Sequence, residues 1–237
     1  MFRRVDYKKA AKEQLKGRWK VPVLSTLLLY ALVTVFSVAM ALIFPDKIHV
    51  NMNMGAGSFS YGIHGDKEPT LFSLLICAVA AAFVFAQKRL FDLMFRSREE
   101  VSFGDFAEGL GYWLKAVLAS IWKCLWIFLW SLLFWIPGIV KTYSYSMMFY
   151  VMAEYPKIGI RKALNISKEL TRGYKGDLFV TDITFIPLGF LCVLSLGIGF
   201  LWLVPYYQAT YTNIYHALKE VALNSQRIKP EDFETTK

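Results

Sequence analysis

The sequence predicts an all-α polytopic membrane protein with six transmembrane helices arranged as three hairpins. First, the 237 residues are 56% hydrophobic and 16% aromatic, with a mean hydropathy of +0.39, which is more apolar than an ordinary water-soluble domain. Second, Val21–Phe44 is an uncharged run long enough to cross about 30 Å of hydrocarbon at about 1.5 Å per residue. Third, lysine and arginine gather in alternate connecting segments, as they do on the cytoplasmic side of membrane proteins.

Six apolar segments are the predicted spans. They cover residues 21–44, 70–86, 116–136, 139–153, 178–194 and 200–217. The last four form two long stretches, each about twice the hydrocarbon thickness if helical, so each stretch must fold back on itself. The Pro137–Gly138 pair predicts the turn in the first stretch, and Gly197 and Gly199 predict it in the second. Pro187 and Pro205 predict breaks or bends inside spans five and six.

The basic residues predict the orientation of the chain. All but four of the 27 lysines and arginines lie on one side of the six-span arrangement, which puts both termini in the cytoplasm. The net charge of +9 is therefore assigned to topology and to anionic lipid headgroups, and nucleic acid is not an expected partner. Residues 1–218 form one membrane domain and residues 219–237 a polar cytoplasmic tail. A signal peptide ending near Ser37–Ala41 is the alternative for the first run, which exceeds an ordinary signal-peptide core.

Short amphipathic helices are predicted on the cytoplasmic side, ahead of spans one, three and five. They cover residues 5–15, 102–110 and 157–172, and Ser102 with Asp105 forms a capping box at the second. After each helix a glycine, an aromatic residue and a lysine precede the membrane, in LKGRWK, GLGYWLK and TRGYKG. A glycine ends a helix, whereas aromatic and lysine side chains anchor a chain at the headgroups. An internal repeat and coincidental membrane-entry chemistry both remain open.

The outer loop, residues 45–69, has its own pattern. Alternating segments flank Gly55–Gly57, which predicts a small external β-hairpin. In this hairpin Met54 pairs with Phe59, Met52 with Tyr61 and Val50 with Ile63. A copper site formed by the loop's histidines and methionines is the alternative, but the four ligands are loosely spaced. We therefore expect no metal here.

Polar side chains inside the spans form the candidate intramembrane polar site. The set is Lys123, Lys141, Asp182, Gln208, Tyr211 and Tyr215. Charge is costly in hydrocarbon and is a functional hypothesis by default. Lys123 is expected to reach the interface or to pair with Asp182, and the polar stripes of spans four and six to join helices. The alternative is that these residues line a substrate path.

Enzyme signatures are absent from the sequence. None of the three histidines has a recognisable catalytic spacing, and no zinc-protease, nucleophile-elbow or phosphate-loop motif occurs. Cys77, Cys124 and Cys192 fall inside predicted spans, which indicates neither a disulfide nor a metal set. The tryptophans repeated over residues 122–130 predict a packing or lipid-facing ridge. We therefore expect no catalytic residue, no metal and no cofactor.

Four segments together resemble the bacterial integral membrane proteins grouped as domain of unknown function 975. They are AKEQLKGRW (Ala11–Trp19), IPGIVKTYSYSMMFYVMAEYP (Ile136–Pro156), SKELTRGYKGDLF (Ser167–Phe179) and LGIGFLWLVPY (Leu196–Tyr206). The outer loop has no counterpart in this resemblance. What the resemblance implies is a bacterial polytopic inner-membrane protein without an established activity, and it transfers no catalytic or binding residue.

The leading hypothesis is a non-catalytic binding, scaffold or permease-like component of a bacterial cytoplasmic (inner) membrane. Its expected partners are membrane lipids, with a membrane protein or a second copy of the chain as a further candidate. The first alternative is a small transporter or lipid-handling protein that uses the proline-interrupted spans five and six. The second is a membrane-embedded enzyme, which requires Glu154, Asp182 and His216 to converge.

Overall fold

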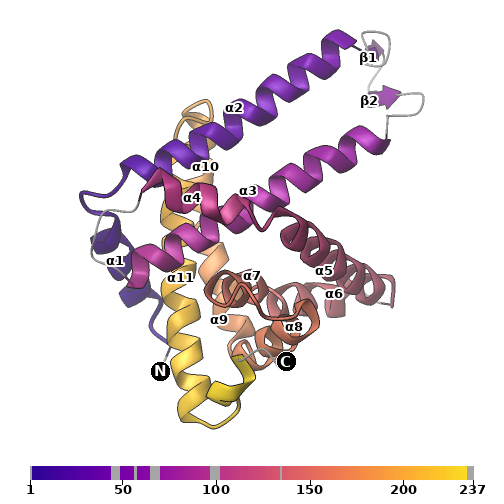
Figure 1. The fold of residues 1–237 in the computed structure, drawn as a ribbon. Helices are drawn as coiled ribbons and strands as arrows, with labels where there is room; N and C mark the ends of the chain where they lie inside the picture. The colour runs from indigo at the N-terminus through magenta and orange to yellow at the C-terminus, as the bar shows by residue number, and fades with distance from the viewer. Residues whose placement is uncertain are drawn as a thin grey trace.

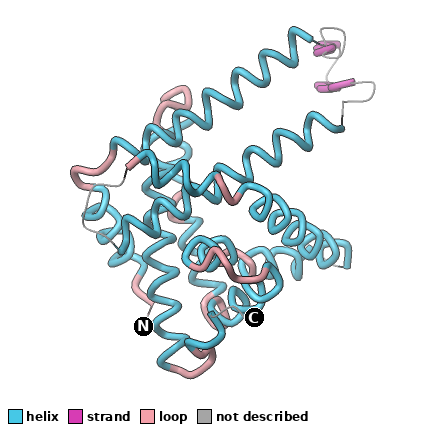
Figure 2. Tube along the Cα trace, in the orientation of Figure 1, coloured by secondary structure: helices cyan, strands magenta, loops and turns pink. Residues whose placement is uncertain are grey.

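A computed structural model of the protein describes residues 2–43, 49–55, 58–64, 70–96, 102–133 and 135–233. Helices make up nearly all of this part of the chain (Figures 1 and 2). The elements are α1 (Arg4–Leu15), α2 (Lys20–Ile43), β1 (His49–Gly55), β2 (Ser58–His64), α3 (Thr70–Arg96), α4 (Phe103–Leu110), α5 (Trp113–Leu133), α6 (Trp135–Ser144), α7 (Met148–Glu154), α8 (Ile160–Leu170), α9 (Lys175–Ile183), α10 (Ile186–Leu194), α11 (Phe200–Asn224) and the 3-10 turn η2 (Pro230–Phe233).

Pairs of consecutive helices extend from a shared centre (Figure 1). α2 and α3 lie side by side and carry the β-hairpin at their far ends, α5 contacts α6, and α10 contacts α11. The centre is formed where α3, α7, α8 and α11 meet. β1 and β2 pair antiparallel with Met54 opposite Phe59, so the strand register is the predicted one.

Two described helical segments are long and apolar enough to cross a membrane. They are Trp113–Leu132 in α5 and Lys175–Leu194, which consists of α9 and α10, with mean hydropathies of 1.4 and 1.8. A third candidate arises if α1 and the first part of α2, Lys20–Val35, are taken together across their bend of 95°. Only 11% of the apolar window of the first helix and 22% of that of the second are buried within the protein. The apolar side chains of these helices therefore lie largely on the protein surface.

The apolar segment at residues 139–153 is not a single helix, contrary to the prediction. α6 ends at Ser144, and α7 begins at Met148 after a short turn. Every residue of Met148–Ala153 is buried in the centre, against α3 and α8. Hydropathy alone does not distinguish a helix buried in protein from one buried in lipid, because both exclude water from apolar side chains.

Other helix boundaries also differ from the predicted spans. α3 continues to Arg96 and α11 to Asn224, past the predicted ends at residues 86 and 217. The segment 178–194 is divided between α9 and α10, and Pro187 lies in the first turn of α10, where its missing N–H costs no helical hydrogen bond. α11 passes through Pro205 as one helix.

The two predicted turns have different outcomes. The Pro137–Gly138 pair lies inside α6, which begins at Trp135, so this pair does not itself form the connection. Instead, Gly138 allows α6 to approach α5, since a Cβ there would lie 2.3 Å from Ser131 Oγ. Gly197 does lie in the turn between α10 and α11, with φ +85° and its N–H donating to the Cys192 carbonyl at 2.9 Å.

The three predicted amphipathic helices correspond to α1, α4 and α8. The capping box of α4 is confirmed, because the Gly104 N–H donates to Ser102 Oγ at 3.0 Å and the Ser102 N–H donates to Asp105 Oδ2 at 2.8 Å. The apolar faces of all three helices pack on the protein itself, and Leu15, Phe106 and Leu170 are fully buried.

The glycines that follow these helices are not equivalent. Gly17 and Gly173 have φ values of +81° and +86°, the left-handed conformation that ends a helix, whereas Gly111 has φ −57°. The local conformation is therefore shared by two of the three candidate repeats.

Candidate functional site

The predicted intramembrane residues do not form one site. Asp182, on α9, accepts hydrogen bonds from three tyrosine hydroxyls: Tyr143 at 2.9 Å, Tyr207 at 3.0 Å and Tyr211. These donors come from α6 and α11. The carboxylate therefore joins three helices, and its hydrogen-bond partners among the described residues are neutral hydroxyls rather than the ammonium of Lys123.

The two predicted intramembrane lysines lie over aromatic rings. Lys123 Nζ is 5.5 Å from the centroid of the Phe149 ring, and Lys141 Nζ is 4.2 Å from that of Trp130. The pairing of Lys123 with Asp182, which the sequence left open, is not formed. Cation–π attraction is compatible with a low-dielectric surrounding and requires no carboxylate.

Gln208 belongs to a separate polar contact. Its Nε2 donates to Gln87 Oε1 at 2.6 Å, and Gln87 Nε2 donates to Thr26 Oγ1 at 3.3 Å. Nearby on α11, Asn213 and Gln14 exchange two side-chain hydrogen bonds of 2.7 and 3.2 Å. These amide contacts join α11 to α1, α2 and α3, as predicted for polar residues that bind helices together.

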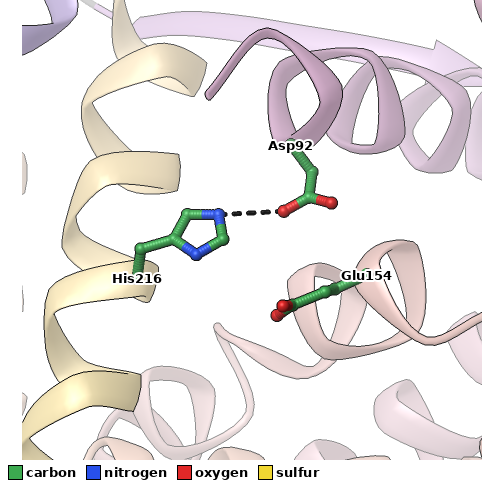
Figure 3. A group of neighbouring side chains, drawn as sticks. All are labelled: Asp92, Glu154 and His216. Atoms are coloured by element: carbon green, nitrogen blue, oxygen red, sulfur yellow. Dashed lines mark hydrogen bonds and ion pairs between the residues drawn. The ribbon is translucent and has the colours of Figure 1, made fainter. Parts of the chain in front are cut away.

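A buried group of charged residues surrounds the last predicted site residue, Tyr215. Figure 3 shows its three central members, Asp92 from α3, Glu154 from α7 and His216 from α11. His216 Nε2 lies 2.9 Å from Asp92 Oδ1, and the Tyr215 hydroxyl donates to Glu154 Oε2. The side chains of Asp92 and Glu154 are only 5% and 6% exposed.

Two cations complete this group. Arg96 contacts both carboxylates, with Nε 3.0 Å from Asp92 Oδ2 and Nη2 2.7 Å from Glu154 Oε1. Lys219 Nζ contacts Glu154 Oε1 and donates to the Tyr155 hydroxyl at 2.7 Å. We call these five residues, Asp92, Arg96, Glu154, His216 and Lys219, the central ion cluster.

The central ion cluster favours the ionised form of Glu154. Burial by itself raises the pKa of this carboxyl group. Hydrogen bonds from Lys219 and Tyr215, together with the charges of Lys219 and Arg96, outweigh burial and hold the pKa of Glu154 below its ordinary value of 4.5. The cluster thus holds an ionised carboxylate and its paired cations at the junction of α3, α7 and α11.

The ligand atoms of Asp92, Glu154 and His216 lie within 4.8 Å of one another, which is close enough to consider a metal ion. The two carboxylates are already balanced by Arg96 and Lys219, so a divalent cation would have to displace both. Within the described residues the His216 ring makes one hydrogen bond, to Asp92, and its face stacks on Phe95 at 3.8 Å. A nucleophile hydrogen-bonded to this ring is therefore not present in the described part of the chain.

A membrane-embedded enzyme would require three residues to converge, and only two of them lie together. Glu154 and His216 do meet, but through Asp92, while Asp182 is held by the tyrosines. Asp92 and Arg96 were not singled out by the sequence analysis. Their spacing of four residues on one helix face, next to the buried Phe91 and Met94, was the available signal.

Comparison with known proteins identifies one family. Residues 134–222 match the family model described as protein of unknown function (DUF975). This match, over part of the chain, supports membership of the DUF975 family. The matched region begins at α6 and ends within α11, so it contains three of the four resembling segments but not Ala11–Trp19. No curated protein and no solved structure matches the chain.

Proposed function

We propose that this DUF975 protein is a non-catalytic binding or scaffold component of a bacterial cytoplasmic membrane. In this proposal three helical hairpins, α2–α3, α5–α6 with α7, and α9–α10 with α11, enter the bilayer in six crossing segments. Both termini and the amphipathic helices α1, α4 and α8 lie on the cytoplasmic side. Membrane lipids are the proposed partners.

The observation that carries the proposal is the exposure of large apolar side chains along these hairpins. On α5, Ile121, Phe128 and Leu132 are 59%, 64% and 75% exposed, and on α10 Phe190 and Leu194 are 64% and 65% exposed. Each is a side chain that water hydrates poorly. A contiguous apolar surface of this kind marks a membrane or protein contact, and the lengths of α5 and of α9–α10 fit a bilayer.

The arrangement of the polar groups supports binding rather than transport or catalysis. A transport path bordered by Lys141, Asp182, Gln208 and Tyr211 would bring these side chains to one space. Lys141 instead contacts a tryptophan, Asp182 the tyrosines, and Gln208 a second glutamine. Asp182 and Gln208, which are hydrogen-bonded in this way, stabilise helix–helix contacts.

Cysteine accessibility in intact cells tests the proposal. In a variant with Cys77, Cys124 and Cys192 replaced by serine, Ser58→Cys reports on the β-hairpin and Lys157→Cys on the segment between α7 and α8. We expect a membrane-impermeant maleimide to label Ser58→Cys in intact cells and Lys157→Cys only after permeabilisation. Labelling of Lys157→Cys from outside would refute the six-span orientation. Recovery of the protein in the soluble fraction would refute membrane insertion.

A further inference from the structure

A cavity of about 400 Å³ lies between α5, α6 and α8. Trp122, Trp126 and Trp130 line it from α5, Lys141 lines it from α6, and Arg161 and Lys168 line it from α8. Arg161 Cζ is 4.9 Å from the centroid of the Trp122 ring, and Lys141 Nζ is 4.2 Å from that of Trp130. We call this cavity the basic tryptophan pocket.

The three cations of the pocket have no anionic partner among the described residues. Arg89, Arg96, Arg172 and Lys219 each form an ion pair with a carboxylate. By contrast, Lys141, Arg161 and Lys168 form no ion pair and donate no side-chain hydrogen bond to any other described residue. Like charges that converge on one cavity repel one another, so an anion bound between them would relieve that repulsion. The pocket therefore has the electrostatics of an anion site.

The walls of the pocket indicate what kind of anion fits. Indole rings prefer the headgroup level of a bilayer, where one side is apolar and the other is wet. The same helix, α5, exposes Ile121, Leu125 and Phe128 outside the pocket, so an apolar surface continues from it. A free phosphate would use the cations alone. An anionic phospholipid would use both features, its phosphate between the cations and its acyl chains along α5.

We propose that the basic tryptophan pocket binds the phosphate headgroup of an anionic phospholipid. This inference rests on the proposed membrane insertion, because Arg161 and Lys168 then lie in the cytoplasmic segment between spans four and five. It assigns to Lys141 a ligand-binding role, and to the tryptophans the wall against which the lipid lies. Basic pockets between helices are suited to lipid phosphates in general.

The test uses the purified full-length chain in a neutral detergent and native mass spectrometry. The protein is titrated with phosphatidylglycerol and, separately, with phosphatidylcholine, and retained lipid is counted. The pocket variant carries Lys141→Gln, Arg161→Gln and Lys168→Gln. The matched control removes the same charge at three exposed lysines outside the pocket, by Lys9→Gln, Lys16→Gln and Lys157→Gln. A third variant, Arg161→Lys, retains the charge.

We expect wild type, the control and Arg161→Lys to retain phosphatidylglycerol in preference to phosphatidylcholine. The pocket variant should bind phosphatidylglycerol roughly 100-fold more weakly, as three cations near an anionic surface predict. Undiminished binding by the pocket variant would overturn the inference, as would displacement of the lipid by inorganic phosphate alone. If the chain inserts in the accessibility experiment but the pocket variant keeps its lipid, only this inference fails. If the chain does not insert, the proposed function fails first.

If the triple pocket variant is recovered unfolded, as judged by its thermal transition, the single variant Lys141→Gln replaces it. That variant should weaken phosphatidylglycerol binding about fivefold, and binding equal to that of wild type would again overturn the inference.

Discussion

Replacing Glu154 by glutamine should destabilise the protein by about 3 kcal/mol. The substitution keeps the size of the side chain but removes the negative charge that Arg96 and Lys219 share. Removing one partner of a buried ion pair costs about 3–5 kcal/mol, because the remaining charge stays buried. Lys219 is 15% exposed and Arg96 is 45% exposed, so Arg96 can recover water and the lower end of the range applies.

The assay is thermal unfolding of the full-length chain in detergent. For a chain of this size about 1 kcal/mol corresponds to about 2–4 °C, so Tm should fall by about 6–12 °C. The matched control is Glu169→Gln, which removes an exposed carboxylate whose side chain is 42% exposed and lies 3.4 Å from Arg172. An exposed pair contributes about 0–1 kcal/mol, so the Tm of the control should change little.

The pH dependence of stability provides a second, independent test of the Glu154→Gln prediction. Because the folded-state pKa of Glu154 lies below its ordinary value of 4.5, its contribution is fully present above that value. The contribution decreases as the pH falls below about 4.5 and is lost once the folded-state pKa is passed. The stability difference between wild type and Glu154→Gln should thus be constant from about pH 7 to about pH 5 and shrink below. A variant no less stable than Glu169→Gln, or a difference that grows in acid, would refute the reasoning.

Two further predictions concern backbone positions. Gly138→Ala should lower Tm, because the new Cβ would meet Ser131 Oγ at 2.3 Å and Ser131 Cα at 3.1 Å. The control Gly176→Ala, in α9 with no atom within 4 Å of its Cβ, should raise stability by about 0.5–1 kcal/mol. Equal effects at both sites would contradict the close approach of α5 and α6. Ser102→Ala should cost about 1 kcal/mol by removing the cap of α4 and should speed hydrogen exchange at the Gly104 amide. Unchanged exchange there would show that the cap does not hold the helix end.

Features that depend on neighbouring residues could be predicted from the sequence. The uncharged run of span one predicts α2 to within a residue at each end, because a long apolar stretch satisfies its backbone only as a helix. Alternation about Gly55 predicts the strand register, since side chains on a strand change face at every residue. The Ser102–Asp105 spacing predicts the capping box, because both partners lie within one turn of the helix.

Contacts between distant segments could not be predicted in this way. Asp92 and Glu154 are far apart in the chain, and they come together only because α3 and α7 pack at the centre. The apolar residues of Met148–Ala153 have the composition of a span, but the structure surrounds them with protein. The composition of a segment indicates that it avoids water, but its packing determines whether protein or lipid surrounds it.

The basic residues also show that the sequence alone does not reveal which charges share a pocket. For topology, Arg161 and Lys157 are equivalent, because both add a positive charge to the same connecting segment. The fold makes them different, since Arg161 lies over Trp122 in the basic tryptophan pocket whereas Lys157 is exposed in the turn before α8. A charge that only orients the chain can be exchanged for another on the same side, but a charge that binds a lipid phosphate cannot. Variants of equal net charge, one altered inside the pocket and one outside it, therefore separate the two roles.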